Sequence, residues 1–121
     1  MKRLALIIDD SHATADTLGQ MLDLLGYAVR QAYTPSSALR ELGATQPQVV
    51  LLDINMPGID GFEVFGFLRR DPRLALVPVI FVSSEGQPET IARARSLGAA
   101  DFLTKPVSLE TVEAALKQLF P

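Results

Sequence analysis

Residues 49–61 read VVLLDINMPGIDG, a wholly apolar run that ends on an aspartate and continues into a series of turn-forming residues. An apolar run without polar alternation is typical of a strand that is covered on both faces, as in the centre of a parallel sheet. We therefore predict a buried strand over residues 49–52 that ends at Asp53. The Asn, Pro and Gly residues that follow predict a loop before the next helix begins.

Three further apolar runs also end on polar residues that suit phosphate or metal chemistry. Residues 4–8 precede Asp9 and Asp10, residues 79–82 precede Ser83, and residues 102–104 precede Lys105 and Pro106. Longer segments between the runs carry apolar residues at helical spacing, as at Leu18, Met21, Leu22 and Leu25. The pattern is a strand followed by a helix, repeated five times.

This alternation predicts a single α/β domain over residues 1–121, with a five-stranded parallel sheet and helices on both faces. The expected strand order is 2-1-3-4-5, which is the flavodoxin-like arrangement. In that order the carboxyl ends of strands one, three, four and five meet at one edge of the sheet, where open α/β folds bind ligands. Three carboxylates, a hydroxyl and an ammonium would then share one crevice.

Turn and cap residues indicate the remaining boundaries. A second strand is expected over residues 28–33, and the glycines at positions 26, 43 and 98 are expected to end the first, second and fourth helices. Ile91, Ala94 and Leu97 form a thin inward stripe on the fourth helix. Ser108 is expected to cap the last helix, whose inward residues are Leu109, Val112, Leu116 and Leu119.

Composition excludes several classes of function. The 121 residues carry a net charge of −3, which argues against direct nucleic-acid binding. The chain has no cysteine, which excludes disulfides and thiolate chemistry and fits a reducing compartment, so a cytoplasmic location is expected. Asp9 and Asp10 interrupt the first apolar run before a signal peptide or membrane span could form, so no membrane association is expected.

Asp9, Asp10 and Asp53 are expected to lie close together at the sheet edge. At about 5 Å and an effective dielectric constant near 20, each pair of carboxylates repels by roughly 3 kcal/mol. A divalent cation that prefers oxygen ligands relieves this repulsion, which favours Mg²⁺, with Mn²⁺ as a substitute. Zinc matches less well, because His12 is the only histidine and cysteine is absent.

The same residues indicate phosphoryl chemistry. A carboxylate at a strand end can attack phosphorus and form an acyl phosphate, which makes Asp53 the candidate nucleophile. Asp10 and Asp53 would hold the metal, with Asp9 acting through water, and the metal would neutralise charge as the phosphoryl group arrives. The phosphoryl oxygens would be bound by the Lys105 ammonium, the Ser83 hydroxyl and the Ser84 backbone amide.

In order and spacing, these residues resemble the receiver domain of bacterial response regulators in two-component signalling, over essentially the whole chain. The matching parts are the acidic pair Asp9 and Asp10, the segment at residues 53–61, Ser83 after an apolar strand, and the pair Lys105-Pro106. The resemblance implies that Asp53 accepts a phosphoryl group from a phosphohistidine on a histidine kinase or phosphotransfer protein. It also implies Mg²⁺ bound by Asp10, Asp53 and the Asn55 backbone carbonyl.

The resemblance further implies a switch in which Ser83 moves toward the phosphate and the Phe102 ring turns inward. Ser83 stands where threonine is commoner and keeps the hydroxyl, and an ordinary core role for Phe102 stays open. Asn55, at the phosphate site, and Glu85 occupy positions that tune dephosphorylation in the family. Such a domain is expected to be a signalling switch rather than an enzyme, and to catalyse only its own phosphorylation and dephosphorylation.

By resemblance, the face made by the fourth helix, the fifth strand and the fifth helix controls an output protein or domain. Phosphorylation-dependent dimerisation is one form that this output could take. The chain ends at Pro121 directly after the last helix, so a stand-alone receiver is slightly favoured over a piece of a longer regulator.

Taken singly, Asp10 and Ser83 are as readily turn formers or helix caps as functional residues. Other functions of the whole chain match the residues less well. One alternative is a receiver-like fold whose acidic site serves phosphate-independent protein binding. A haloacid-dehalogenase-type phosphohydrolase needs a second aspartate where this chain has Asn55. A flavodoxin-like electron carrier needs a phosphate loop where this chain has two aspartates that would repel the flavin phosphate. His12 as a phosphate carrier would require a helical bundle.

Overall fold

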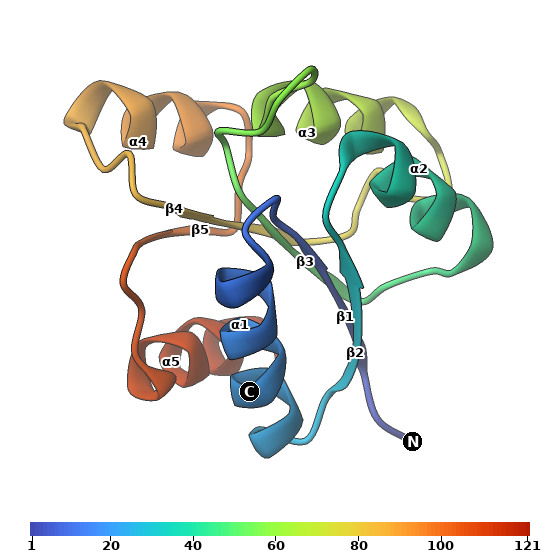
Figure 1. Ribbon diagram of the computed structural model, residues 1–121, viewed down its shortest axis with the longest axis vertical. Helices are drawn as coiled ribbons and strands as arrows, with labels where there is room; N and C mark the ends of the chain where they lie inside the picture. The colour runs from blue at the N-terminus through green and yellow to red at the C-terminus, as the bar shows by residue number, and fades with distance from the viewer.

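The computed structural model describes residues 1–121 as five strands that alternate with five helices (Figure 1). The strands are β1 (Leu4–Ile8), β2 (Ala28–Ala32), β3 (Val49–Leu52), β4 (Val79–Ser83) and β5 (Asp101–Thr104). The helices are α1 (His12–Leu24), α2 (Pro35–Ala44), α3 (Gly61–Arg70), α4 (Pro88–Ser96) and α5 (Leu109–Leu119). All neighbouring strands pair in parallel, in the order β2-β1-β3-β4-β5. The predicted fold class and strand order are confirmed.

Helices cover both faces of the sheet. In Figure 1, α2, α3 and α4 lie on one side of the sheet, and α1 and α5 lie on the other. Successive strand residues alternate between the two cores: Leu6 and Ile8 of β1 pack with the first group of helices, and Ala5 and Ile7 pack with the second. This burial on both faces explains why the central strands are apolar at every position. None of the helices has the length and apolar character needed to cross a membrane.

The end of α2 differs from the prediction. Gly43 does not end this helix, which continues to Ala44 and has Thr45 as its C-cap. The Arg73 guanidinium donates hydrogen bonds to the carbonyls of Thr45 and Leu42. Because a distant side chain satisfies these terminal carbonyls, the helix needs no glycine in the left-handed region at its end.

The other corrections are small. β2 is one residue shorter than predicted, whereas β4 and β5 are each one residue longer. Gly26 and Gly98 follow α1 and α4 with φ of 91° and 97°, as predicted for glycines that end helices. The inward stripe of α4 is thinner than predicted, because Leu97 lies at the C-cap and is 46% exposed. In α5, Leu109 and Leu119 are only half-buried.

Candidate functional site

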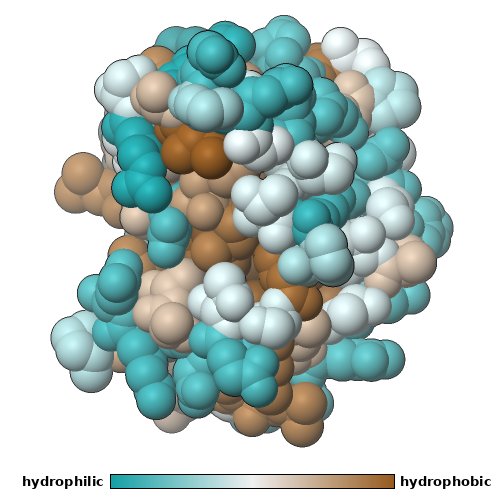
Figure 2. All heavy atoms as spheres, turned by 90° about the vertical axis from the view of Figure 1, so that its left-hand side faces the viewer, coloured by the Kyte–Doolittle hydropathy of each residue, from teal (hydrophilic) through white to brown (hydrophobic).

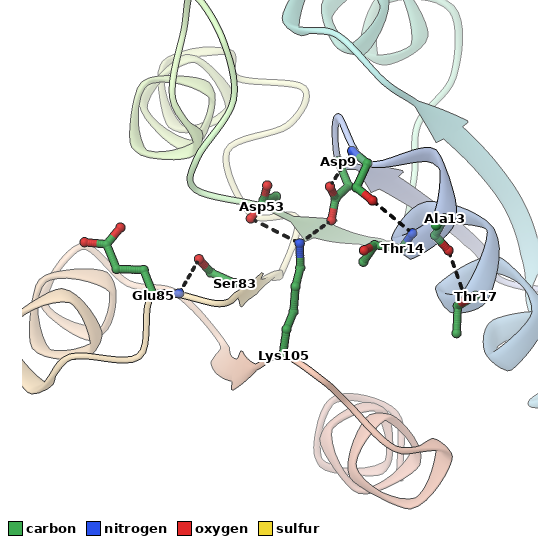
Figure 3. Close-up of polar contacts among 9 residues, drawn as sticks. Asp9, Ala13, Thr14, Thr17, Asp53, Ser83, Glu85 and Lys105 are labelled. Carbon is green, nitrogen blue, oxygen red and sulfur yellow. Dashed lines mark hydrogen bonds and ion pairs between the residues drawn. The ribbon is translucent and has the colours of Figure 1, made fainter.

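The polar residues that follow the strands lie together at the carboxyl edge of the sheet, where their side chains face one another (Figure 3). Backbone pairing continues one step past the strand ends. The Asp53 N–H donates to the Ile8 carbonyl at 2.9 Å, and the Lys105 N–H donates to the Ser83 carbonyl at 2.9 Å. These hydrogen bonds fix the backbone from which the functional side chains project.

Lys105 is the counter-ion of two buried carboxylates. Its Nζ lies 2.8 Å from Asp9 Oδ2 and 3.6 Å from Asp53 Oδ1. Asp9 is 1% exposed and Asp53 is 5% exposed, and Ser83 is the only other buried polar residue. Asp9 Oδ1 accepts a hydrogen bond from the Ser11 N–H at 2.9 Å. Asp9 Oδ2 contacts the ammonium without the alignment of a hydrogen bond, so this buried oxygen has only an ionic partner.

The electrostatic environment raises the pKa of Asp53 from 3.8 to about 6. Burial is the largest cause, because it penalises the charged form, and the Asp9 carboxylate is the second. The Lys105 ammonium and the backbone amide of Ile54 oppose the shift, while Asp10 adds a smaller increase. A single lysine therefore does not fully compensate the negative charge at this edge of the sheet.

The carboxylates form a candidate cation site. One oxygen from each of Asp9, Asp10 and Asp53 lies within 4.8 Å of the others, and Asp10 is exposed to solvent. The donor set consists of oxygen atoms, which suits a hard divalent cation such as Mg²⁺. Lys105 is the one cation that forms ion pairs with these carboxylates, so three carboxylates share a single positive charge. The residues present thus fit a bound Mg²⁺ ion.

Two serines follow each other at the end of β4. Ser83 is fully buried, and its Oγ accepts a hydrogen bond from the Glu85 N–H at 3.1 Å. This contact uses the oxygen of the hydroxyl as acceptor and leaves its hydrogen available for donation. Ser84 is exposed on the loop that follows. The structure therefore brings the Ser83 hydroxyl, rather than the Ser84 side chain, into the buried part of the site.

Glu85 links two loops at the rim of the site. Its Oε2 accepts a hydrogen bond from the Asn55 amide at 3.2 Å, and its Oε1 accepts one from the Thr90 hydroxyl at 3.4 Å. The loop after β3 is thereby connected to the first turn of α4. The sequence singles out Asn55 and Glu85 but gives no signal for Thr90, because that contact depends on how α4 docks.

Two aromatic residues near the sheet edge have defined places. Phe102 is 8% exposed, and its ring centroid lies 6.2 Å from that of Phe81 in the core. In this structure the Phe102 ring is thus packed inward, which fits both a core role and the inward position of the implied switch. His12 begins α1 at the surface and stacks on Tyr33, with ring centroids 3.7 Å apart. The stacking was not predicted, because it depends on the packing of α1 beside the end of β2.

Comparisons with known proteins agree with this geometry. Residues 5–117 match the sequence profile of the response regulator receiver domain. The chain is 37% identical over 114 residues to the DNA-binding dual master transcriptional regulator RpaA of Synechocystis, covering 94% of this chain and 47% of RpaA. It therefore spans about half the length of that relative. It is 36% identical over 107 residues to PilH of Pseudomonas aeruginosa, covering 88% of each protein.

Comparison of the fold with solved structures also identifies a response regulator. The chemotaxis response regulator CheY4 of Vibrio cholerae superimposes with a TM-score of 0.91 at 27% identity, covering 99% of this chain and 100% of CheY4. Receiver domains are signalling domains that interact with histidine kinases and output domains, and they bind Mg²⁺ at an acidic cluster of the kind found here. The chain therefore belongs to the response regulator receiver domain family of two-component signalling.

Proposed function

We propose that Asp53 is the phosphoacceptor of this receiver and takes a phosphoryl group from a phosphohistidine on a histidine kinase or phosphotransfer protein. The observation that carries the proposal is the placement of Asp53, buried at the strand end with the Lys105 ammonium 3.6 Å from its Oδ1. Keeping a buried carboxylate of raised pKa ionised beside a single cation lowers the stability of the fold. Such arrangements concentrate at functional sites.

The transfer exchanges one bond for another. An Asp53 carboxylate oxygen bonds to phosphorus as the bond between phosphorus and the donor's imidazole nitrogen breaks, and the imidazole leaves with the electron pair and gains a proton. The resulting acyl phosphate carries more negative charge than the carboxylate it replaces. Lys105 and the Ser83 hydroxyl would each bind a phosphoryl oxygen, with Asn55 and the Ser84 backbone amide contributing further contacts.

Mg²⁺ would be held by Asp10, Asp53 and the Asn55 backbone carbonyl, with Asp9 acting through water. When bound, the ion supplies positive charge that offsets the charge of the incoming phosphoryl group. Asp9 itself is engaged by Lys105 at 2.8 Å, which leaves the exposed Asp10 more accessible to a metal that keeps several waters. Mn²⁺ would be able to replace Mg²⁺ at such an oxygen site.

The output surface would be the face formed by α4, β5 and α5. Figure 2, which views the molecule from that side, shows apolar atoms gathered in a hollow between polar rims. We propose that phosphorylation alters this face through Ser83 and Phe102, and that a partner protein, an output domain or a second copy of the chain responds. A cytoplasmic, bacterial setting suits this role, which includes catalysis only of the domain's own phosphorylation and dephosphorylation.

The test is intact-mass measurement after incubation with acetyl phosphate and Mg²⁺. The wild type should gain one phosphoryl group, and both Asp53→Asn and the addition of EDTA should prevent the gain. Asp23→Asn is the matched control, because Asp23 is an exposed aspartate on α1, away from the sheet edge. Wild type that stays unlabelled, under conditions that label another receiver and with a phosphorylated histidine donor, would support phosphate-independent binding instead.

A further inference from the structure

We propose that Gly61, the first residue of α3, is a positioning residue for the phosphoacceptor. The inference rests on the proposed function of Asp53 and concerns how its backbone is held. Gly61 is buried, and its lack of a side chain allows α3 to begin directly against the peptide that joins Asp53 to Ile54.

The space at Gly61 cannot accept even a methyl group. A Cβ atom placed there would lie 2.2 Å from the Asp53 carbonyl oxygen and 2.8 Å from Ile54 Cα. Both contacts are with backbone atoms, which cannot rotate away as a side chain can. The contrast is Gly66 in the same helix, where a Cβ would meet only the end of the flexible Arg70 side chain, at 3.2 Å.

Hydrogen bonds hold the backbone on both sides of the peptide that joins Asp53 to Ile54. On the strand side, the Asp53 N–H donates to the Ile8 carbonyl of β1 at 2.9 Å. On the helix side, the Gly61 N–H donates to the Ile54 carbonyl at 2.8 Å and closes the loop that contains Asn55. The position of α3 therefore sets both the phosphoacceptor backbone and the loop whose Asn55 carbonyl is proposed to bind Mg²⁺.

Helix α3 is itself firmly placed, so it cannot easily retreat from an added methyl group. Asp60 caps it by accepting from the Glu63 N–H at 2.9 Å, and the Glu63 side chain accepts from the Asp60 N–H. The Phe62 ring packs against Phe81 in the core, with centroids 5.2 Å apart. A side chain at position 61 is thus expected to displace the Asp53 peptide and to shift its carboxylate relative to Lys105.

The test compares Gly61→Ala with Gly66→Ala and with Asp60→Ala. The first variant adds a methyl group against Asp53, the second adds one in the same helix without that contact, and the third weakens the α3 cap without adding an atom. Three properties are measured: the initial rate of labelling by acetyl phosphate, Mg²⁺ affinity by calorimetry, and the thermal unfolding midpoint. Because misplacement of reacting groups by about 1 Å can cost on the order of 100-fold in rate, Gly61→Ala should label at least about tenfold more slowly.

Gly61→Ala should also bind Mg²⁺ more weakly, whereas Gly66→Ala and Asp60→Ala should keep near wild-type rates and affinities per folded molecule, even if Asp60→Ala unfolds at a lower temperature. Wild-type labelling and Mg²⁺ affinity in folded Gly61→Ala would overturn the proposal, and so would an equal loss of rate in Asp60→Ala. If Gly61→Ala is partly unfolded, trimethylamine oxide restores the folded state for the same measurements. Failure of the proposed function itself is distinguishable, because the wild type would then not be labelled.

Discussion

Along β1 and β3, the apolar interior of the sheet and its charged edge are directly adjacent. Ile8 of β1 and Leu52 of β3 are fully buried and lie next to each other in the parallel register. The next residues along the two strands are Asp9 and Asp53, which are buried as well but carry carboxylates. Burial stabilises the first pair through the hydrophobic effect and opposes ionisation of the second. The comparison indicates that the interior favours folding, whereas the edge lowers stability and provides the chemistry.

Truncation of the interior should have the largest effect on stability. Phe81 is fully buried and lies within aromatic contact distance of Phe62, Phe65 and Phe102. Phe81→Ala should lower the free energy of unfolding by about 4 kcal/mol, because it loses buried area and leaves a cavity. Urea titration followed by circular dichroism measures this change. A loss below about 1 kcal/mol would show that the interior is not tightly packed.

Removal of the lysine at the sheet edge should have the next largest effect on the free energy of unfolding. Lys105→Gln leaves Asp9 and Asp53 buried without their cation and should lower the free energy of unfolding at neutral pH by about 2–3 kcal/mol. The same substitution should cost less in the Asp53→Asn background, where one fewer charge needs compensation. A double-mutant cycle from urea titrations gives the coupling, and additive effects would contradict the role of Lys105 as a shared counter-ion.

Neutralising Asp53 should stabilise the protein. Because the pKa of Asp53 is raised from 3.8 to about 6 in the folded state, the stability gained by protonation is fully present below about pH 4 and is lost as the pH rises through about 6. Asp53→Asn should therefore be more stable than the wild type by about 2–3 kcal/mol at pH 7.5 and by much less near pH 4. Thermal unfolding of both proteins between these pH values measures the difference in stability. A difference that stays constant with pH would show that Asp53 does not titrate in this range.

Metal addition should have the smallest effect. Mg²⁺ at ten times its dissociation constant should raise the free energy of unfolding of the wild type by about 1.4 kcal/mol, because it binds only the folded site. The increase should be much smaller in Asp53→Asn, and EDTA should reverse it. Equal stabilisation of Asp53→Asn, measured by thermal unfolding at constant ionic strength, would place the ion elsewhere.

The same contrast explains what could be predicted from the sequence. The apolar runs and the helical spacing between them predict a parallel sheet with helices on both sides, because its strands are buried on both faces, and the flavodoxin-like arrangement gives the strand order. The convergence of Asp9, Asp53, Ser83 and Lys105 follows from that order, since each comes at or just after a strand end. These features depend on local sequence pattern and simple topology.

The details that were missed depend on packing between elements. Arg73 caps α2 from a loop far along the chain, which is why Gly43 does not end that helix. The sequence shows two adjacent aspartates but does not indicate which of them is buried. In the structure Asp9 is buried against Lys105, whereas Asp10 is exposed. The contact of Gly61 with the Asp53 carbonyl likewise depends on the exact docking of α3.

Reductive trapping of the labelled protein tests the central claim most directly. Borohydride reduces an acyl phosphate of aspartate to homoserine, which peptide mass spectrometry can place at a single residue. After incubation with acetyl phosphate and Mg²⁺, we predict homoserine at position 53 and none at positions 9 or 10. Conversion of Asp9 or Asp10, or a mass gain that leaves Asp53 unreduced, would contradict the account of the charged edge as a phosphoacceptor site centred on Asp53.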